Sequence, residues 1–94
     1  PAASRDGVYA IFDPSASLKP GVTVDAWSHA VLSSGAAAIQ LRLKSATSQQ
    51  RLPWAREILP HCRTHQVALI VNDDVALALE LALREGPGRI GVHP

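Results

Sequence analysis

The chain has 94 residues, enough for one small domain, and nine Lys plus Arg residues against eight Asp plus Glu give it a net charge of +1. This charge creates no long-range field that would gather nucleic acid or anionic lipid. No apolar stretch approaches the ~20 residues of a membrane span, and the single Cys62 excludes an intrachain disulfide. We therefore expect a soluble, cytoplasmic protein whose partners are neither nucleic acid nor membrane.

Strand and helix patterns alternate along the sequence. Short apolar runs bounded by turn residues predict strands at 7–12, 38–43, 67–71 and 89–92. Apolar residues at helical spacing predict helices from Val24 to Gly35, from Ser48 through Cys62, and from Val75 to Arg84. The sequence therefore predicts an α/β protein of parallel βα repeats, with four strands and three helices.

The helix boundaries follow from capping residues. Thr23 is a suitable cap for the first helix, Thr47 or Ser48 for the second, and Asp73 or Asp74 for the third. Pro60 removes a backbone donor and crowds the carbonyl of the residue four positions earlier. We expect it to kink the second helix or end it early.

This βα rhythm occurs both in doubly wound sheets and in (β/α)₈ barrels. A complete barrel needs ~250 residues, so the chain would form about half of one. We interpret residues 1–94 as a single partial TIM-barrel domain, the N-terminal half, with a small flavodoxin-like domain as the alternative. The chain starts at Pro1 and contains no Met, which suggests trimming or a piece of something longer.

Polar residues alternate with apolar ones in the second predicted strand. Gln40, Arg42 and Lys44 share one face, and the apolar residues between them should face the helices. Cations directed toward a barrel axis are costly to bury unless an anion accompanies them. The pattern indicates an anion site, although the two cations could also reach solvent at the mouth of the strand.

The third predicted strand runs into Asn72, Asp73 and Asp74. One of these residues suffices to cap the following helix, so three exceed that need. Oxygen ligands at the carboxyl ends of parallel strands are where α/β proteins collect Mg²⁺ and phosphates. We expect Asn72 and Asp73 to bind a ligand, and His93 on the fourth strand is a further candidate for the same face.

These segments resemble the thiamine-phosphate synthases. The resemblance rests on Val8 to Pro14, on Gln-x-Arg-x-Lys at 40–44, on Ile70 to Ala78 with its Val-Asn-Asp-Asp, and on Gly91-Val92-His93. It spans nearly the whole chain but only the first half of the family's (β/α)₈ barrel. Departures are Leu43, where the family usually has an acidic residue, and Phe12, where it commonly has a small polar one.

The resemblance implies a transferase that joins hydroxymethylpyrimidine diphosphate to thiazole phosphate, releases diphosphate and uses Mg²⁺. It further implies that Arg42 and Lys44 hold the diphosphate, Asn72 positions it, Asp73 ligates Mg²⁺ and Gln40 contacts the pyrimidine. Later strands of the family supply further ligands, so these 94 residues alone are expected to be inactive, and their partner would be the missing C-terminal half-barrel or a second copy of the chain.

Two other functions remain open. One is a related thiazole tautomerase, which shares the barrel but not this phosphate-site pattern. The other is a non-catalytic half-barrel that assembles with a partner chain through its exposed strand edges.

Overall fold

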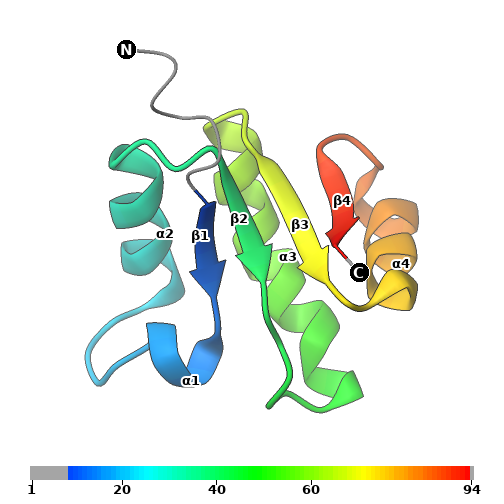
Figure 1. The fold of residues 1–94 in the computed structure, drawn as a ribbon, viewed down its shortest axis with the longest axis horizontal. Helices are drawn as coiled ribbons and strands as arrows, with labels where there is room; N and C mark the ends of the chain where they lie inside the picture. Colours follow the sequence, from blue (N-terminus) through cyan, green and yellow to red (C-terminus); the bar gives the residue numbers. More distant parts are fainter. Residues whose placement is uncertain (1–8, 94) are drawn as a thin grey trace.

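The computed structural model describes residues 9–93, and the predicted strand residues Gly7 and Val8 lie outside them. Strands and helices alternate in chain order (Figure 1). The elements are β1 (Tyr9–Phe12), α1 (Pro14–Ser17), α2 (Val24–Ser33), β2 (Ala38–Leu41), α3 (Ser48–Thr64), β3 (Ala68–Asn72), α4 (Val75–Glu85) and β4 (Ile90–His93).

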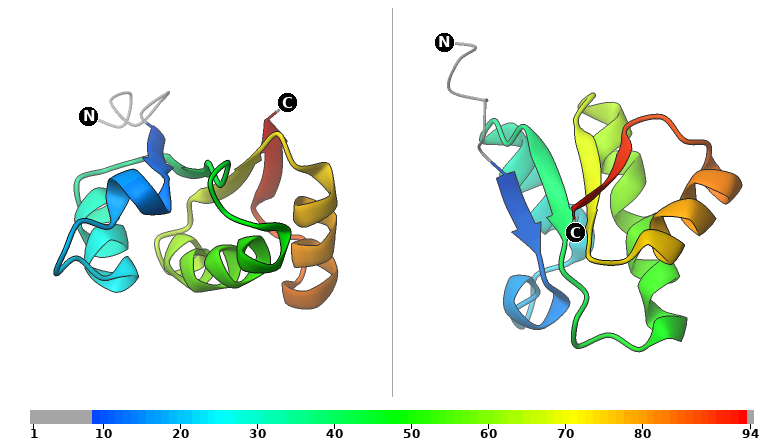
Figure 2. Two further views of the ribbon diagram at one scale, coloured as in Figure 1. Left: turned by 90° about the horizontal axis from the view of Figure 1, so that it is seen from below. Right: turned by 45° about the vertical axis from the view of Figure 1, so that its right-hand side comes forward.

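The four strands run parallel and lie side by side in sequence order, β1-β2-β3-β4. Helices α2, α3 and α4 all lie on the same side of this sheet (Figure 2). A flavodoxin-like sheet instead has the strand order 2-1-3-4-5 and helices on both faces, whereas a (β/α)₈ barrel keeps its strands in sequence order with its helices outside. The protein is therefore α/β with the winding of half a (β/α)₈ barrel, as predicted.

The helix-covered face of the sheet forms the core. Every strand residue directed toward the helices from β2 and β3 is apolar and almost completely buried: Ile39, Leu41, Leu69 and Val71. The helices contribute a matching set, Leu32 of α2, Ala55, Ile58, Leu59 and Cys62 of α3, and Leu77, Ala78 and Leu81 of α4. The apolar periodicity in the sequence thus identifies the packed side of each element.

Phe12 belongs to this core. Its ring is fully buried, with its centroid 5.0 Å from that of Trp27 in an edge-on arrangement and 5.6 Å from that of Trp54. Aromatic pairs favour such tilted geometries. The bulky residue at this position therefore fills space between β1 and the two helices instead of projecting from the open face.

The opposite face of the sheet carries no helix within the described residues (Figure 2). Ile11, Gln40, Ile70 and Gly91 are in register across the four strands and so share this face. Tyr9 and Ile11 are half exposed there. In a complete barrel, this face would line the interior.

Three differences from prediction stand out, beside shifts of one or two residues at the other element ends. Helix α1 was not expected: Pro14 opens it and the Asp13 carboxylate accepts a hydrogen bond from the Ser15 amide, 3.2 Å away. Strand β2 ends at Leu41 and not at residue 43. A kink or an early end was predicted at Pro60, and the early end is wrong, because α3 continues for another turn to Thr64.

The helix starts agree with prediction. Thr23 caps α2 by accepting a hydrogen bond from the Ala26 amide at 3.1 Å, and Thr47 precedes α3, where its amide donates to Gln50 at 3.0 Å. Such caps satisfy backbone groups that lack a partner within the helix. Between residues 9 and 93, no helix is both long and apolar enough to cross a membrane.

Candidate functional site

The segment after β2 keeps the alternation of the strand although the strand itself has ended. The Arg42 amide still donates to the Phe12 carbonyl at 2.8 Å, which extends the pairing with β1. Leu43 is buried, while Arg42 and Lys44 are exposed. The prediction that Leu43 faces the helices is confirmed, and both cations are free to meet an anion at this edge of the sheet.

Of the three Asx residues at the end of β3, only Asp74 caps the following helix. Asp74 caps α4, because its Oδ1 atom accepts a hydrogen bond from the Leu77 amide at 3.0 Å. Asp73 takes no part in capping, and its carboxylate forms no hydrogen bond or ion pair with residues 9–93. Its backbone has a φ of 61°, a left-handed conformation that Asp tolerates better than most residues.

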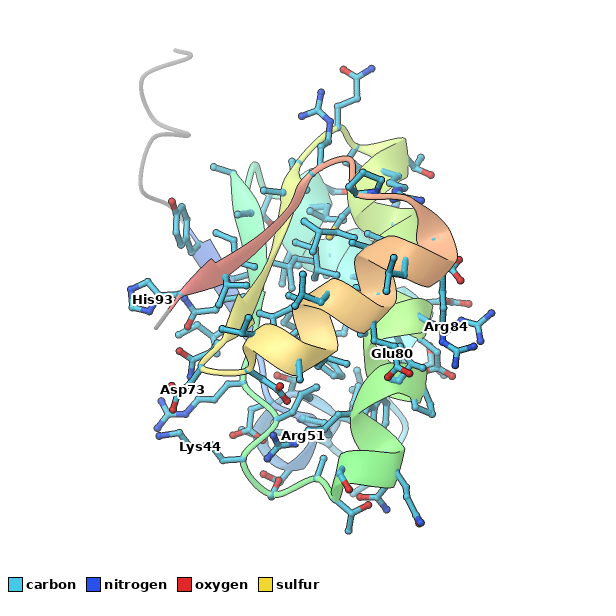
Figure 3. The ribbon with its side chains drawn as sticks, turned by 90° about the vertical axis from the view of Figure 1, so that its right-hand side faces the viewer. Lys44, Arg51, Asp73, Glu80, Arg84 and His93 are labelled. Atoms are coloured by element: carbon cyan, nitrogen blue, oxygen red, sulfur yellow. The ribbon has the colours of Figure 1, made fainter. Side chains whose placement is uncertain are left out.

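Three of the predicted site residues line one small cavity of about 70 Å³. Lys44 reaches it from the loop after β2, and Asn72 and Asp73 reach it from the end of β3. Figure 3 shows Lys44 and Asp73 on the same edge of the molecule, at the carboxyl ends of the strands. The structure therefore brings an ammonium group, an amide and a carboxylate together, as the spacing of the two motifs predicted.

The other three predicted residues lie near this cavity but do not line it. Gln40 is partly buried on the open face of the sheet, and Arg42 is exposed one pleat further along. His93 is exposed at the end of β4 and is in register with Asn72. The carbonyl of His93 accepts a hydrogen bond from the Asp73 amide at 2.6 Å, which ties the two strand ends together.

Arg51 is the residue that sequence reasoning missed. It lies in the first turns of α3 and lines the same cavity. Its Nη1 atom is 2.9 Å from Oδ2 of Asp74, and its Nε donates to the carbonyl of Ala46 at 3.3 Å. The sequence signal was weak: a cation, Arg51, early in one helix and a capping carboxylate, Asp74, at the start of the next. Parallel βα units place the starts of consecutive helices side by side.

The described residues offer limited ligands for a metal. No group of three or more His, Cys, Asp or Glu side chains within residues 9–93 could hold one. The Asp73 carboxylate has no partner among the residues that the structure describes, and Asn72, which precedes it in the chain, carries an amide oxygen. Mg²⁺ is usually bound by one or two carboxylates together with substrate phosphates and water, so these residues fit an ion that a diphosphate brings with it.

A larger groove of about 570 Å³ lies elsewhere, between α1 and the first half of α3. Its lining is mainly small, amide or apolar side chains with one charged residue, Glu57, and contains none of the predicted site residues. The groove lining contains no Lys or Arg, whereas Lys44 and Arg51 line the smaller cavity. The chemistry of the lining therefore favours the smaller cavity at the strand ends as the anion site.

Cys62 is a core residue. Its side chain is fully buried on α3, and burial raises the pKa of its thiol from 9.0 to about 12. The thiolate is the nucleophilic form of cysteine, and this environment suppresses it.

Comparison with known proteins assigns the sequence to a family. Residues 8–85 match the family described as thiamine monophosphate synthase. The chain belongs to the thiamine monophosphate synthase family. The matched segment includes Gln40, Arg42, Lys44, Asn72 and Asp73, whereas His93 lies beyond it.

Similar proteins named thiamine-phosphate synthase occur in several bacteria. The chain is 37% identical to that of Marinobacter nauticus over 89 residues, which cover 95% of this chain and 36% of the relative. It is 41% identical to that of Methylobacillus flagellatus over 75 residues, which cover 80% of this chain and 34% of the relative. It is 48% identical to that of Chlorobium phaeobacteroides over 50 residues, which cover 53% of this chain and 24% of the relative.

The matched part of the chain thus spans between about a quarter and about a third of the length of these curated relatives. No solved structure gave a significant match.

Proposed function

We propose that this chain forms the N-terminal part of an enzyme that makes thiamine phosphate from hydroxymethylpyrimidine diphosphate and thiazole phosphate, with release of diphosphate. The observation that carries the proposal is the cavity at the strand ends, where Lys44, Asn72 and Asp73 meet. Membership of the family supports the same reaction. The named relatives support it over a tautomerase.

The cations would act on the leaving group. When the bond between the pyrimidine methylene carbon and the diphosphate oxygen breaks, the carbon becomes cationic and the diphosphate gains negative charge. Fixed positive charges stabilise such a developing charge. We assign this task to Lys44 and Arg42, which are exposed at the same strand end.

The remaining residues would position the two substrates. Asn72 would hold the diphosphate, Gln40 would contact the pyrimidine from the open face, and His93 would bind substrate at the neighbouring strand end. The thiazole nitrogen then attacks the cationic carbon to form the new C–N bond, so the main demand on the protein is orientation. Asp73 would ligate Mg²⁺, which when bound supplies further positive charge to the diphosphate.

The open face of the sheet supports the view that further strands are needed to complete the domain. We propose that residues 1–94 are one half of a barrel domain, and that strands supplied by a C-terminal half or by a second copy cover this face. A parallel sheet is normally buried on both sides, whereas Tyr9 and Ile11 are half exposed here.

The test uses a fusion protein, defined as residues 1–94 joined to the part of the Methylobacillus flagellatus relative that follows its matched segment. We expect the fusion protein to form thiamine phosphate from the two substrates and Mg²⁺, and the 94-residue chain alone to form none. A folded fusion protein without product would contradict the proposal. Rearrangement of a thiazole substrate without the pyrimidine diphosphate would instead favour a tautomerase.

The site itself is tested by Asp73→Asn in the fusion protein. Loss of the carboxylate should lower turnover about 100-fold and raise the Mg²⁺ concentration required. Asp25→Asn is the matched control, because Asp25 lies on α2, contacts His61 and does not line the cavity. Equal activity in both variants would remove Asp73 from the site.

A further inference from the structure

We infer that Arg51 is a positioning residue that joins the two loops of the proposed site, and this inference rests on the proposed function. Its guanidinium connects three segments. Its backbone belongs to α3, its Nε bonds to the Ala46 carbonyl in the loop after β2, and its Nη1 meets Asp74 at the start of α4. Lys44 belongs to the first of these loops, and Asp73 precedes Asp74 in the second.

Asp74 makes this connection effective because both of its carboxylate oxygens are engaged. Oδ1 accepts the Leu77 amide and Oδ2 meets Arg51. Its backbone therefore has little freedom to rotate away from α4. The adjacent Asp73 is held in the left-handed region, which a residue with a side chain occupies at a cost unless its neighbours fix it.

Arg51 also sets the charge of the cavity. It neutralises Asp74, which leaves Asp73 as the cavity-lining carboxylate without an ion pair among residues 9–93. Without Arg51, two adjacent carboxylates would face the site of a diphosphate. That arrangement would repel the ligand that Lys44 is proposed to attract.

A role in stability alone explains the pair less well. The side chains of Arg51 and Asp74 are 31% and 21% exposed, and ion pairs with this exposure usually add little to folding stability. A second pair, Arg56 with Glu85 at 3.2 Å, already joins α3 to α4 at the other end of α4. What distinguishes Arg51 is that it spans the two loops that carry the site residues.

The experiment compares Arg51→Met, Arg51→Lys and the control Arg56→Met in the fusion protein, with urea unfolding to confirm that each is folded. The first readout is amide hydrogen exchange. We expect Arg51→Met to speed exchange about fivefold in both residues 42–47 and residues 72–74, with no change in the central strands, and Arg56→Met to change neither loop. Unchanged exchange rates in both loops of Arg51→Met, or an equal increase in Arg56→Met, would overturn the inference.

The second readout is the affinity for inorganic diphosphate with Mg²⁺, measured by calorimetry. We expect the Kd to rise about tenfold in Arg51→Met and only about threefold in Arg51→Lys, because lysine keeps the charge but lacks the planar guanidinium that reaches Ala46 and Asp74 together. An unchanged Kd in Arg51→Met would contradict a role in positioning the site.

The two readouts separate this inference from the proposed function. If the parent fusion protein neither binds diphosphate nor makes product while its loops still loosen in Arg51→Met, the proposed function fails and the coupling of the loops by Arg51 stands. If product forms normally and the loops do not respond, only the role of Arg51 is lost.

Discussion

The two faces of the sheet differ in what covers them. On the helix side, Leu69 and its neighbour Ile39 on β2 are completely buried, whereas Tyr9 and Ile11 on the other side each remain 50% exposed. Both faces are built by the same strands, since successive residues point in opposite directions. The difference shows that the helix side is packed as a core, whereas the open side leaves apolar side chains in contact with solvent.

The largest expected effect on folding stability comes from the helix side of the sheet. Leu69→Ala removes a fully buried side chain and should lower the free energy of unfolding by about 3 kcal/mol in urea denaturation. Ile11→Ala on the open face of the 94-residue chain should cost less than about 1 kcal/mol, because half of that side chain already meets water. Equal costs would mean that the two faces are packed alike.

The open side is expected to matter for activity and not for stability. In the fusion protein, Lys44→Ala should reduce turnover about 100-fold and leave the urea midpoint unchanged, because the ammonium group is exposed at the strand end. The control is Lys19→Ala, which alters the only other lysine of the chain, exposed in the turn before α2. Comparable activity in the two variants would contradict an anion site at Lys44.

A pH dependence of the free energy of unfolding should come from the helix side of the sheet, where Cys62 is buried. Burial raises the pKa of Cys62 from 9.0 to about 12, so the thiol stays protonated in the folded chain after it has ionised in the unfolded one. This difference has no effect below about pH 9, and stability is lost as the pH rises from 9 toward 12. Between pH 8 and pH 10, the free energy of unfolding should fall by about 1.4 kcal/mol more than in Cys62→Ala. Identical pH profiles for the two proteins would show that Cys62 is not the source.

The smallest effect is a gain in stability. The hydroxyl of Ser28 is buried on α2 without a hydrogen-bond partner in the described part of the chain. Ser28→Ala should raise the free energy of unfolding by about 1 kcal/mol, because it removes an unsatisfied polar atom. Ser33→Ala, at an exposed position of the same helix, controls for helix propensity and should gain less. A loss of stability in Ser28→Ala would show that the hydroxyl has a partner in solution.

The sequence predicted the features that depend on local periodicity. The strands, the three long helices and the buried side of each followed from the spacing of apolar residues. The cap at Thr23 followed from residue type, as did the choice between Asp73 and Asp74, of which Asp74 is the cap in the structure. Helix α1 could not be anticipated in this way. Its four residues are too few to show a helical period, and it depends on bonds between Asp13 and Ser15.

Pro60 and Arg51 show two further limits. Pro60 is on the exposed side of α3, where the carbonyl it leaves unpaired can bond to water, so the helix continues. The contact of Arg51 with Asp74 joins residues 23 positions apart, and Arg51 belongs to no recognisable motif. The proximity of Lys44 to Asp73 was predictable, because it follows from parallel strands alone.

The sequence order of the strands has a consequence for how the protein is made. Each βα unit packs mainly on the unit that precedes it in the chain, through β1 with β2, β2 with β3, and α3 with α4. Such nearest-neighbour contacts need no distant segment before they form, and contacts between nearby segments favour rapid folding. Each new unit can therefore dock onto the preceding one while the ribosome is still adding residues.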